Sequence, residues 1–256
     1  MRGGPTVVRD RSRAGVEVHV ARMPRFQTRS AILTTRFGSM DTQLGDGTPL
    51  PDGTAHFLEH LMFQVDGRDV FDVYAARGAA ANAYTTFSST SYVFSCTDRF
   101  ESNLRTLLGT VARFVADDDA VERERRIIGQ EIAMYADDAS WRGYFNLMQA
   151  LYRRHPVRLD IAGTDASIAA LDRGLLDRVQ RTFYRPSNLI LVVAGDVDAH
   201  RVMARVDSSL PRTRGPRVPR RPAVREGRSP RRARVETSLS VSRPHVALGF
   251  KLSPPG

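Results

Sequence analysis

The chain of 256 residues has little cysteine, little lysine and no long apolar run. Its single cysteine, Cys96, excludes a disulfide within the chain, and such usage is typical of a reducing compartment. No segment approaches the roughly 18 consecutive apolar residues of a membrane-spanning helix. The basic residues 1–5 are not followed by the apolar run of a signal peptide. We therefore expect a cytoplasmic protein with no membrane partner.

Signatures of several enzyme classes are also missing. The sequence contains neither Gly-x-Gly-x-x-Gly nor a P-loop pattern, which argues against nucleotide binding. Ser88, Ser89 and Ser91 lie outside any Gly-x-Ser-x-Gly pattern and have no base close by in the sequence. We therefore do not expect a serine hydrolase.

The net charge of +10 is concentrated in one segment. Residues 211–235 hold ten arginines and one glutamate, which gives +9, so the rest of the chain is close to neutral. Lys251 is the one lysine among 38 basic residues, a bias that fits a GC-rich genome better than selected phosphate recognition. Because the segment lacks interleaved aromatic residues and any recognisable binding module, we expect no nucleic-acid partner.

A pattern typical of a metal site lies in residues 53–63. His56 and His60 are four residues apart, and Glu59 immediately precedes the second histidine. Four residues span about one helical turn, so both imidazoles share a face and can reach one ion. A catalytic zinc keeps three protein ligands and a water whose proton a nearby carboxylate removes, which makes Glu59 the candidate base. The order H-x-x-E-H is a zinc-peptidase signature, and the alternative is a surface helix with two solvated histidines.

A third ligand must come from another segment. Residues 121–135 have helical periodicity, and Glu124 and Glu131 are seven residues apart, about two turns, so they share a face. One carboxylate could bind zinc while the other supports the site from outside the ligand set. The alternative for any glutamate here is a surface salt bridge with a neighbouring arginine, which we prefer for Glu122.

With these motifs the chain resembles the insulinase and pitrilysin family of zinc peptidases, the inverzincins, in which H-x-x-E-H is followed roughly seventy residues later by E-x-x-x-x-x-x-E. The resemblance implies a Zn²⁺ cofactor and a set of residue roles: ligands His56, His60 and Glu131, general base Glu59, and accessory catalytic glutamate Glu124. Gln130 stands where the family often has a first glutamate, which leaves the ligand position intact.

Further stretches between about residues 15 and 200 resemble the same family. They include Gly38-Ser39, Asn82-Ala83-Tyr84-Thr85, Thr90, Tyr92, His155-Pro156, Gly163-Thr164 and Tyr184–Asn188. In the family the strand at Asn82 and Ala83 is an edge that binds an extended peptide substrate by strand pairing. From the residues alone, Asn82 could equally be a turn residue. The details are most similar to a bacterial cytoplasmic subgroup rather than to the mitochondrial processing enzymes.

Strands and helices are mixed without regular alternation, which predicts an α+β fold with an antiparallel sheet and helices on one face. We expect a hairpin in residues 7–20 and strands within 30–37, 82–97 and 189–194. Expected helices are 71–76, 100–115, 121–135, 141–151, 167–185 and 198–210. The aromatic stripe of the helix at 141–151 is assigned to the core.

We expect a zinc metallopeptidase domain in residues 1–210, an Arg- and Pro-rich linker in 211–237, and the first strand of a truncated second domain in 238–256. The linker lacks the apolar content to fold, whereas Pro244–Phe250 has the pattern of a strand. Members of the family generally close two homologous halves around the peptide as a clamshell. The resemblance therefore implies a second homologous half or partner subunit.

The sequence thus predicts a zinc-dependent endopeptidase in which Glu59 activates a zinc-bound water to hydrolyse peptide bonds. The alternative is a non-catalytic or partner-dependent subunit of a peptidase-like complex with the same fold. Retention of His56, His60, Glu59 and Glu131 favours the enzyme.

Overall fold

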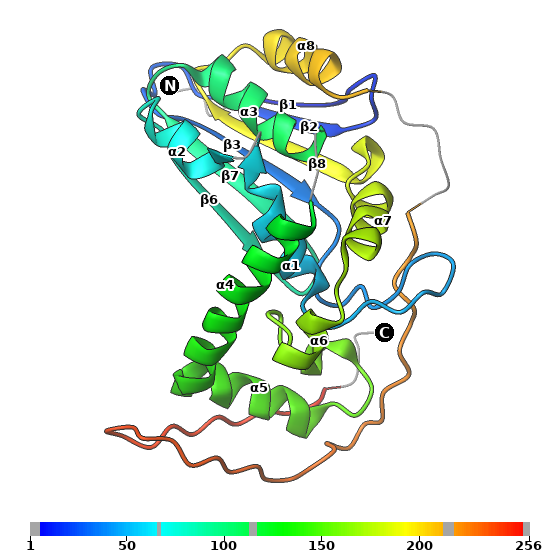
Figure 1. The fold of residues 1–256 in the computed structure, drawn as a ribbon. Coiled ribbons are helices and arrows are strands. Elements are labelled where there is room, and N and C mark those ends of the chain that lie inside the picture. Colours follow the sequence, from blue (N-terminus) through cyan, green and yellow to red (C-terminus); the bar gives the residue numbers. More distant parts are fainter. Residues whose placement is uncertain (1–5, 66–67, 113–116, 212–217, 253–256) are drawn as a thin grey trace.

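The structure is a computed structural model that describes residues 6–65, 68–112, 117–211 and 218–252 (Figure 1). Six strands form one sheet in the order β1-β2-β8-β3-β7-β6. Their bounds are Thr6–Arg11 (β1), Glu17–Arg22 (β2), Arg29–Thr35 (β3), Ala80–Thr85 (β6), Thr90–Cys96 (β7) and Leu189–Gly195 (β8). A separate two-stranded ribbon consists of Gln64–Val65 (β4) and Arg68–Asp69 (β5).

The α+β class predicted from the sequence is confirmed, and the sheet is mixed rather than purely antiparallel. Four of its pairs are antiparallel, but β2 runs parallel to β8, with Glu17 opposite Ile190 and Arg22 opposite Gly195. Parallel neighbours need a long crossover connection, and here almost the whole domain lies between them. Local sequence patterns could not predict this pairing.

Alternating residues of the central strands bury one face of the sheet. The buried side chains are Val18, Val20, Ala31, Leu33, Tyr92, Phe94, Leu191 and Val193. Their neighbours point to the other face, where Val192 is 39% exposed. This alternation explains the strands, since successive side chains of a strand point to opposite faces. Helices pack on the buried side and complete the core.

The helices are Thr54–Met62 (α1), Val70–Ala75 (α2), Phe100–Ala112 (α3), Asp118–Asp137 (α4), Ala139–Leu151 (α5), Asp165–Ala169 (α6), Arg173–Phe183 (α7) and Ala199–Ser209 (α8). Short 3₁₀ turns occupy Pro156–Arg158 and Pro186–Asn188. Helices α3 and α8 pack together, while α4 contacts α1 and extends toward α5 at the opposite end of the molecule (Figure 1). No helix within the described residues is both long and apolar enough to span a membrane.

Two predicted features of the helices are wrong. The single helix expected at 167–185 is divided into α6 and α7, because Asp172 caps a new helix by accepting a hydrogen bond from the Leu175 N–H at 2.7 Å. The aromatic stripe of α5 is only partly in the core. Phe145 is buried, but Tyr144 is 43% exposed, and the Trp141 indole donates a hydrogen bond to Asp160 at 2.7 Å.

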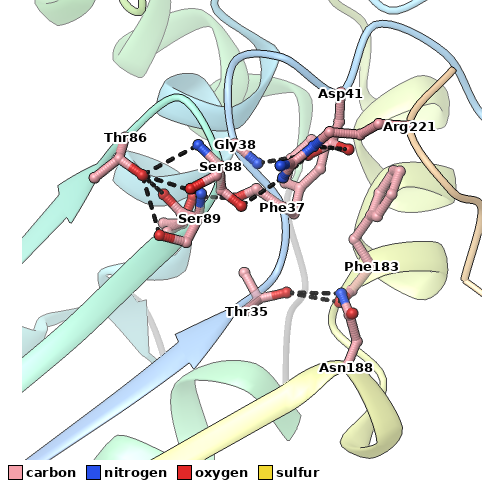
Figure 2. Close-up of polar contacts among 11 residues, drawn as sticks. Thr35, Phe37, Gly38, Asp41, Thr86, Ser88, Ser89, Phe183, Asn188 and Arg221 are labelled. Atoms are coloured by element: carbon pink, nitrogen blue, oxygen red, sulfur yellow. Dashed lines mark hydrogen bonds and ion pairs between the residues drawn. The ribbon is translucent and has the colours of Figure 1, made fainter. Parts of the chain in front are cut away.

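Residues 218–252, here called the C-terminal strap, contain no helix or strand and follow the outside of the domain (orange and red in Figure 1). The Arg221 guanidinium makes two 2.8 Å hydrogen bonds to the Asp41 carboxylate, which also accepts the Gly38 N–H at 2.8 Å (Figure 2). Arg221 also donates to the Ser88 carbonyl oxygen. The predicted linker is therefore attached to the domain at this point.

A second attachment lies beyond α5. The Glu226 carboxylate accepts hydrogen bonds from the N–H groups of Arg153, Arg154 and His155 at 2.8–2.9 Å, and Lys251 lies 3.4 Å from it. Residues 244–250, expected as a strand, form none among the described residues. The assignment of residues 238–256 to a second domain stays a prediction.

Candidate metal centre

Helix α1 presents His56 and His60 on one side and core residues on the other. It begins after Gly53, whose φ of 88° favours glycine and whose position leaves no room for a side chain, since a Cβ would lie 2.5 Å from the Ala162 carbonyl oxygen. Its buried apolar residues are Ala55, Phe57, Leu58, Leu61 and Met62. The two imidazole rings lie one turn apart, with their centroids separated by 4.7 Å. The core contacts of α1 thus fix the orientation of both histidines.

Helix α4 packs against α1 and brings two glutamates to the same histidines. Its first turn is capped by Asp117, which accepts a hydrogen bond from the Ala120 N–H at 2.6 Å. Glu131 lies beside both imidazoles, and Glu124, two turns earlier, lies beside His60 alone. Segments about seventy residues apart in the sequence therefore meet at one place.

The geometry of His56, His60 and Glu131 fits a zinc ion. Ligand atoms about 2.1 Å from a tetrahedral zinc lie roughly 3.4 Å from one another. Glu131 Oε2 is 3.4 Å from His56 Nε2 and 3.5 Å from His60 Nε2, and one ligand atom from each residue lies within 4.8 Å of the others. Glu131 Oε2 is also buried and accepts no hydrogen bond from the described residues. Two imidazoles and one carboxylate leave a fourth position open, as catalytic zinc sites do.

A polar chain continues behind His60. Its Nδ1 lies 3.3 Å from Glu124 Oε2, and Gln64 Nε2 donates to Glu124 Oε1 at 2.6 Å. Arg123 in turn donates to Gln64 Oε1 at 3.0 Å. Such contacts orient a metal-binding histidine and select its tautomer. Gln64 lies in β4, just beyond the end of α1, and no local pattern in the sequence marks it as part of this polar chain.

Glu59 is buried next to the histidines, with 9% of its surface exposed. Its Oε2 accepts a 2.7 Å hydrogen bond from the Thr85 hydroxyl at the end of β6. The sequence analysis named Thr85 only as part of a family resemblance and gave it no contact with Glu59. No local signal could have identified this pair, because the two residues come from different elements.

Burial and neighbouring charges shift the pKa values of these groups in different directions. Burial, together with the charge of His60, lowers the pKa of His56 to about 4. Burial also acts on His60, but the Glu124 and Glu131 carboxylates raise its pKa to about 9. The contact with His60 lowers the pKa of Glu131, and burial raises that of Glu59. The carboxylates that favour a positive charge on His60 would also attract a metal cation.

Strand β6 forms the outer edge of the sheet beside this centre. The exposed residue Asn82 accepts a hydrogen bond from the Ala83 N–H through its own side-chain oxygen, at 2.9 Å. Asn82 is thus in a strand and not in a turn. Ala83 and Thr85 point to the side of the sheet that carries α1, since both are half-buried and Thr85 contacts Glu59.

Residues 46–165, which include all the ligand candidates, match the model of the Insulinase (Peptidase family M16) family. The chain belongs to the insulinase family. YmfH of Bacillus subtilis, named an uncharacterized zinc protease, is 37% identical over 98% of this chain and 60% of its own length. Rv2782c of Mycobacterium tuberculosis, named likewise, is 30% identical over 78% of this chain and 47% of its own length. The chain thus spans about half the length of these relatives.

Solved structures of this family have the same fold. A protein from Alicyclobacillus acidocaldarius, described as an M16-like peptidase, superimposes with a TM-score of 0.84 at 37% identity, covering 91% of this chain and 56% of that one. A Pseudomonas fluorescens domain described as the inactive domain of an M16 peptidase reaches 0.72 at 19% identity, covering 85% of this chain and 53% of its own. The second likeness concerns the fold alone, so function must be argued from the site.

Proposed function

We propose that this chain is the zinc-binding part of a metalloendopeptidase that hydrolyses internal peptide bonds of polypeptides. The observation that carries the proposal is the spacing of His56, His60 and Glu131, which matches the edge of a tetrahedral zinc site, with the Glu59 carboxylate buried beside it. Membership of the insulinase family supports the same chemistry.

In the proposed reaction His56, His60 and Glu131 hold the ion, and Glu124 keeps the His60 ring in place. Bound zinc supplies Lewis-acid activation of the water and of the scissile carbonyl group. Glu59 accepts the proton of the attacking water and later donates it to the leaving amine nitrogen. Its raised pKa, caused by burial, brings it closer to neutral pH, where a residue that both accepts and donates a proton works best.

Strand β6 is the proposed binding site for the substrate backbone. It is an edge strand, so its outer side can pair with an extended peptide through Asn82 and Ala83. The same strand carries Thr85, which contacts Glu59, so a paired peptide would lie next to the base. Binding by strand pairing requires an extended substrate backbone and depends little on the side chains of the substrate.

We further propose that efficient hydrolysis requires a second homologous half or a partner subunit. The chain spans 60% of the length of YmfH. Without a second half the substrate would be positioned less accurately, and a displacement of the scissile bond by even 1 Å can lower the rate on the order of 100-fold. The isolated chain should bind zinc but hydrolyse peptides slowly. A separately produced second half should raise the rate strongly, and rapid hydrolysis by the monomeric chain alone would contradict this.

The single cysteine supports a cytoplasmic location for the protein. We do not propose a nucleic-acid partner, because the arginine-rich segment lacks interleaved aromatic residues and a recognisable binding module. A purely non-catalytic role is less well supported, since His56, His60 and Glu131 lie together as a possible metal site and Glu59 is buried beside them.

The deciding experiment combines zinc quantification with cleavage of a mixed peptide library. Zinc should be present at about one ion per chain, and internal cleavage should disappear with a chelator and return with zinc. Tight zinc binding without cleavage, even with the second half added, would favour the non-catalytic subunit. Cleavage that persists in chelator would rule out the proposed chemistry.

A further inference from the structure

Within the described part of the chain, Glu59 accepts one side-chain hydrogen bond from outside its own helix. The Thr85 hydroxyl donates to Glu59 Oε2 at 2.7 Å, which leaves the other carboxylate oxygen available for proton transfer. Thr85 is the last residue of β6, and its side chain is directed to α1 because alternate residues of this strand, Ala81 and Ala83, have the same half-buried orientation. The contact therefore connects the edge strand to the base.

A group of buried hydroxyls lies next to this contact. Thr90, which is fully buried, donates its only hydroxyl proton to the Phe37 carbonyl oxygen at 2.9 Å. Nearby, the buried tyrosines Tyr92 and Tyr184 share a 2.9 Å hydrogen bond between their hydroxyls. Burial raises the pKa of both tyrosines, so both stay protonated. These residues form a neutral layer beneath the base.

Two side-chain oxygens lie within reach of the Thr85 hydroxyl, those of Glu59 and Thr90. The Thr90 oxygen is 3.4 Å from that of Thr85, and Thr90 gives its own proton to the Phe37 carbonyl oxygen, so it does not donate to Thr85. Glu59 Oε2, at 2.7 Å, is the nearer acceptor for the Thr85 proton. A hydrogen bond from a neutral donor to a buried carboxylate is strong, and it fixes the side-chain rotamer of the acceptor.

We propose that Thr85 is a positioning residue that holds Glu59 in the orientation needed for proton transfer. This inference rests on the proposed peptidase function. It differs from a substrate-binding role for β6, because it concerns the hydroxyl group of Thr85 and not the backbone of the strand.

Three variants separate this role from general effects on folding. Thr85→Val keeps the shape and removes the hydroxyl, Thr85→Ser keeps the hydroxyl, and Thr34→Val is a matched control. Thr34 shares a 2.9 Å hydrogen bond with Ser91 between neighbouring strands of the same sheet but does not touch Glu59. Each variant is assayed with the second half present, for kcat, KM, zinc per chain and Tm.

We expect Thr85→Val to lower kcat roughly 10- to 100-fold with KM and zinc content unchanged, as for other residues that orient a catalytic group. Thr85→Ser should have a kcat within about threefold of the wild-type value, and Thr34→Val should have the wild-type kcat. The inference is wrong if Thr85→Val raises only KM, loses zinc or keeps the wild-type kcat. It is also wrong if Thr85→Ser lowers kcat as much as Thr85→Val does.

A second measurement does not depend on activity. In the metal-free protein, Thr85→Val should lower Tm in the wild-type background and have a clearly smaller effect in a Glu59→Ala background, because the acceptor is gone. Equal shifts in both backgrounds would overturn the inference. Failure of the wild-type protein to cleave any peptide would instead refute the proposed function, while this coupling would still report on the contact.

Discussion

The metal centre and the C-terminal strap are held in place by different means. At the metal centre, His56 and His60 have side chains only 12% and 19% exposed, on a helix whose other side is in the core. The strap has no helix or strand among its described residues, and Val246 and Phe250 are more than 80% exposed. Val218 at its start packs against the core, and beyond it the clearest attachments are the polar contacts of Arg221 and Glu226.

This difference predicts which changes affect function and which affect stability. The fold positions the ligands through apolar packing that does not depend on the ligands themselves, so their replacement should change metal binding with little loss of stability. The strap contributes no group to the centre described here, so its replacement should alter attachment and stability but not zinc affinity. Four changes, given in decreasing order of expected effect, test the comparison.

Loss of a zinc ligand should have the largest effect. Glu131→Gln and His60→Ala should lower zinc affinity by more than about 100-fold, because loss of a mere supporting contact already costs about 10- to 100-fold. Competition with a chromophoric chelator measures this. Glu122→Gln is the control, since Glu122 is exposed and pairs with Arg125. Full zinc retention by Glu131→Gln would identify Glu124 as the third ligand.

Loss of the base should affect turnover alone. Glu59→Gln should reduce peptide hydrolysis by about 100- to 10,000-fold, the usual contribution of general acid–base catalysis. Zinc per chain should equal the wild-type value, because Glu59 is assigned as base and not as ligand. The measurement combines initial rates with metal analysis of the same sample. A metal-free Glu59→Gln protein would contradict the assignment.

Detachment of the strap should reduce stability without affecting the metal. Arg221→Ala leaves the Asp41 carboxylate, whose side chain is 6% exposed, without its charged partner. We expect a loss of about 1–3 kcal/mol in the free energy of unfolding, measured by urea denaturation. Arg225→Ala, an exposed arginine of the same strap, should change it by less than about 0.5 kcal/mol. If Arg221→Ala also lowered zinc affinity, the strap and the metal centre would not be independent of each other.

The pH dependence of the second attachment should be the smallest effect. Burial raises the pKa of Glu226, but the three N–H groups of residues 153–155 and the Lys251 charge outweigh it and lower the pKa to about 2. A lowered folded-state pKa contributes stability above the unfolded value near 4.5, which is lost as pH falls toward 2. The stability difference between wild type and Glu226→Gln should therefore be constant above about pH 5 and shrink on acidification. A difference independent of pH would show that the charge is unimportant.

Much of the fold and site followed from local patterns. The H-x-x-E-H spacing predicted a helix with His56 and His60 on one face, and the structure has α1 at Thr54–Met62. The seven-residue spacing of Glu124 and Glu131 placed both on one side of α4. These predictions succeed because helical periodicity depends only on neighbours in the sequence.

Other features were missed because they depend on distant contacts. The parallel pairing of β2 with β8 joins segments at opposite ends of the domain, and Asp172 begins a new helix where the apolar pattern continues unbroken. Gln64 and Thr85 acquire their roles only through side chains of other elements. No periodicity marks such contacts.

The sequence by itself determined the chemistry available to this protein: two imidazoles one turn apart, a carboxylate between them in sequence, and a second helix with two spaced carboxylates. Only the tertiary structure decided that Glu131 Oε2 lies 3.4 and 3.5 Å from the two imidazoles, that Glu124 lies behind His60, and that the Thr85 hydroxyl donates to Glu59. The physical reason is that backbone geometry fixes distances within an element, whereas burial of apolar surface fixes distances between elements.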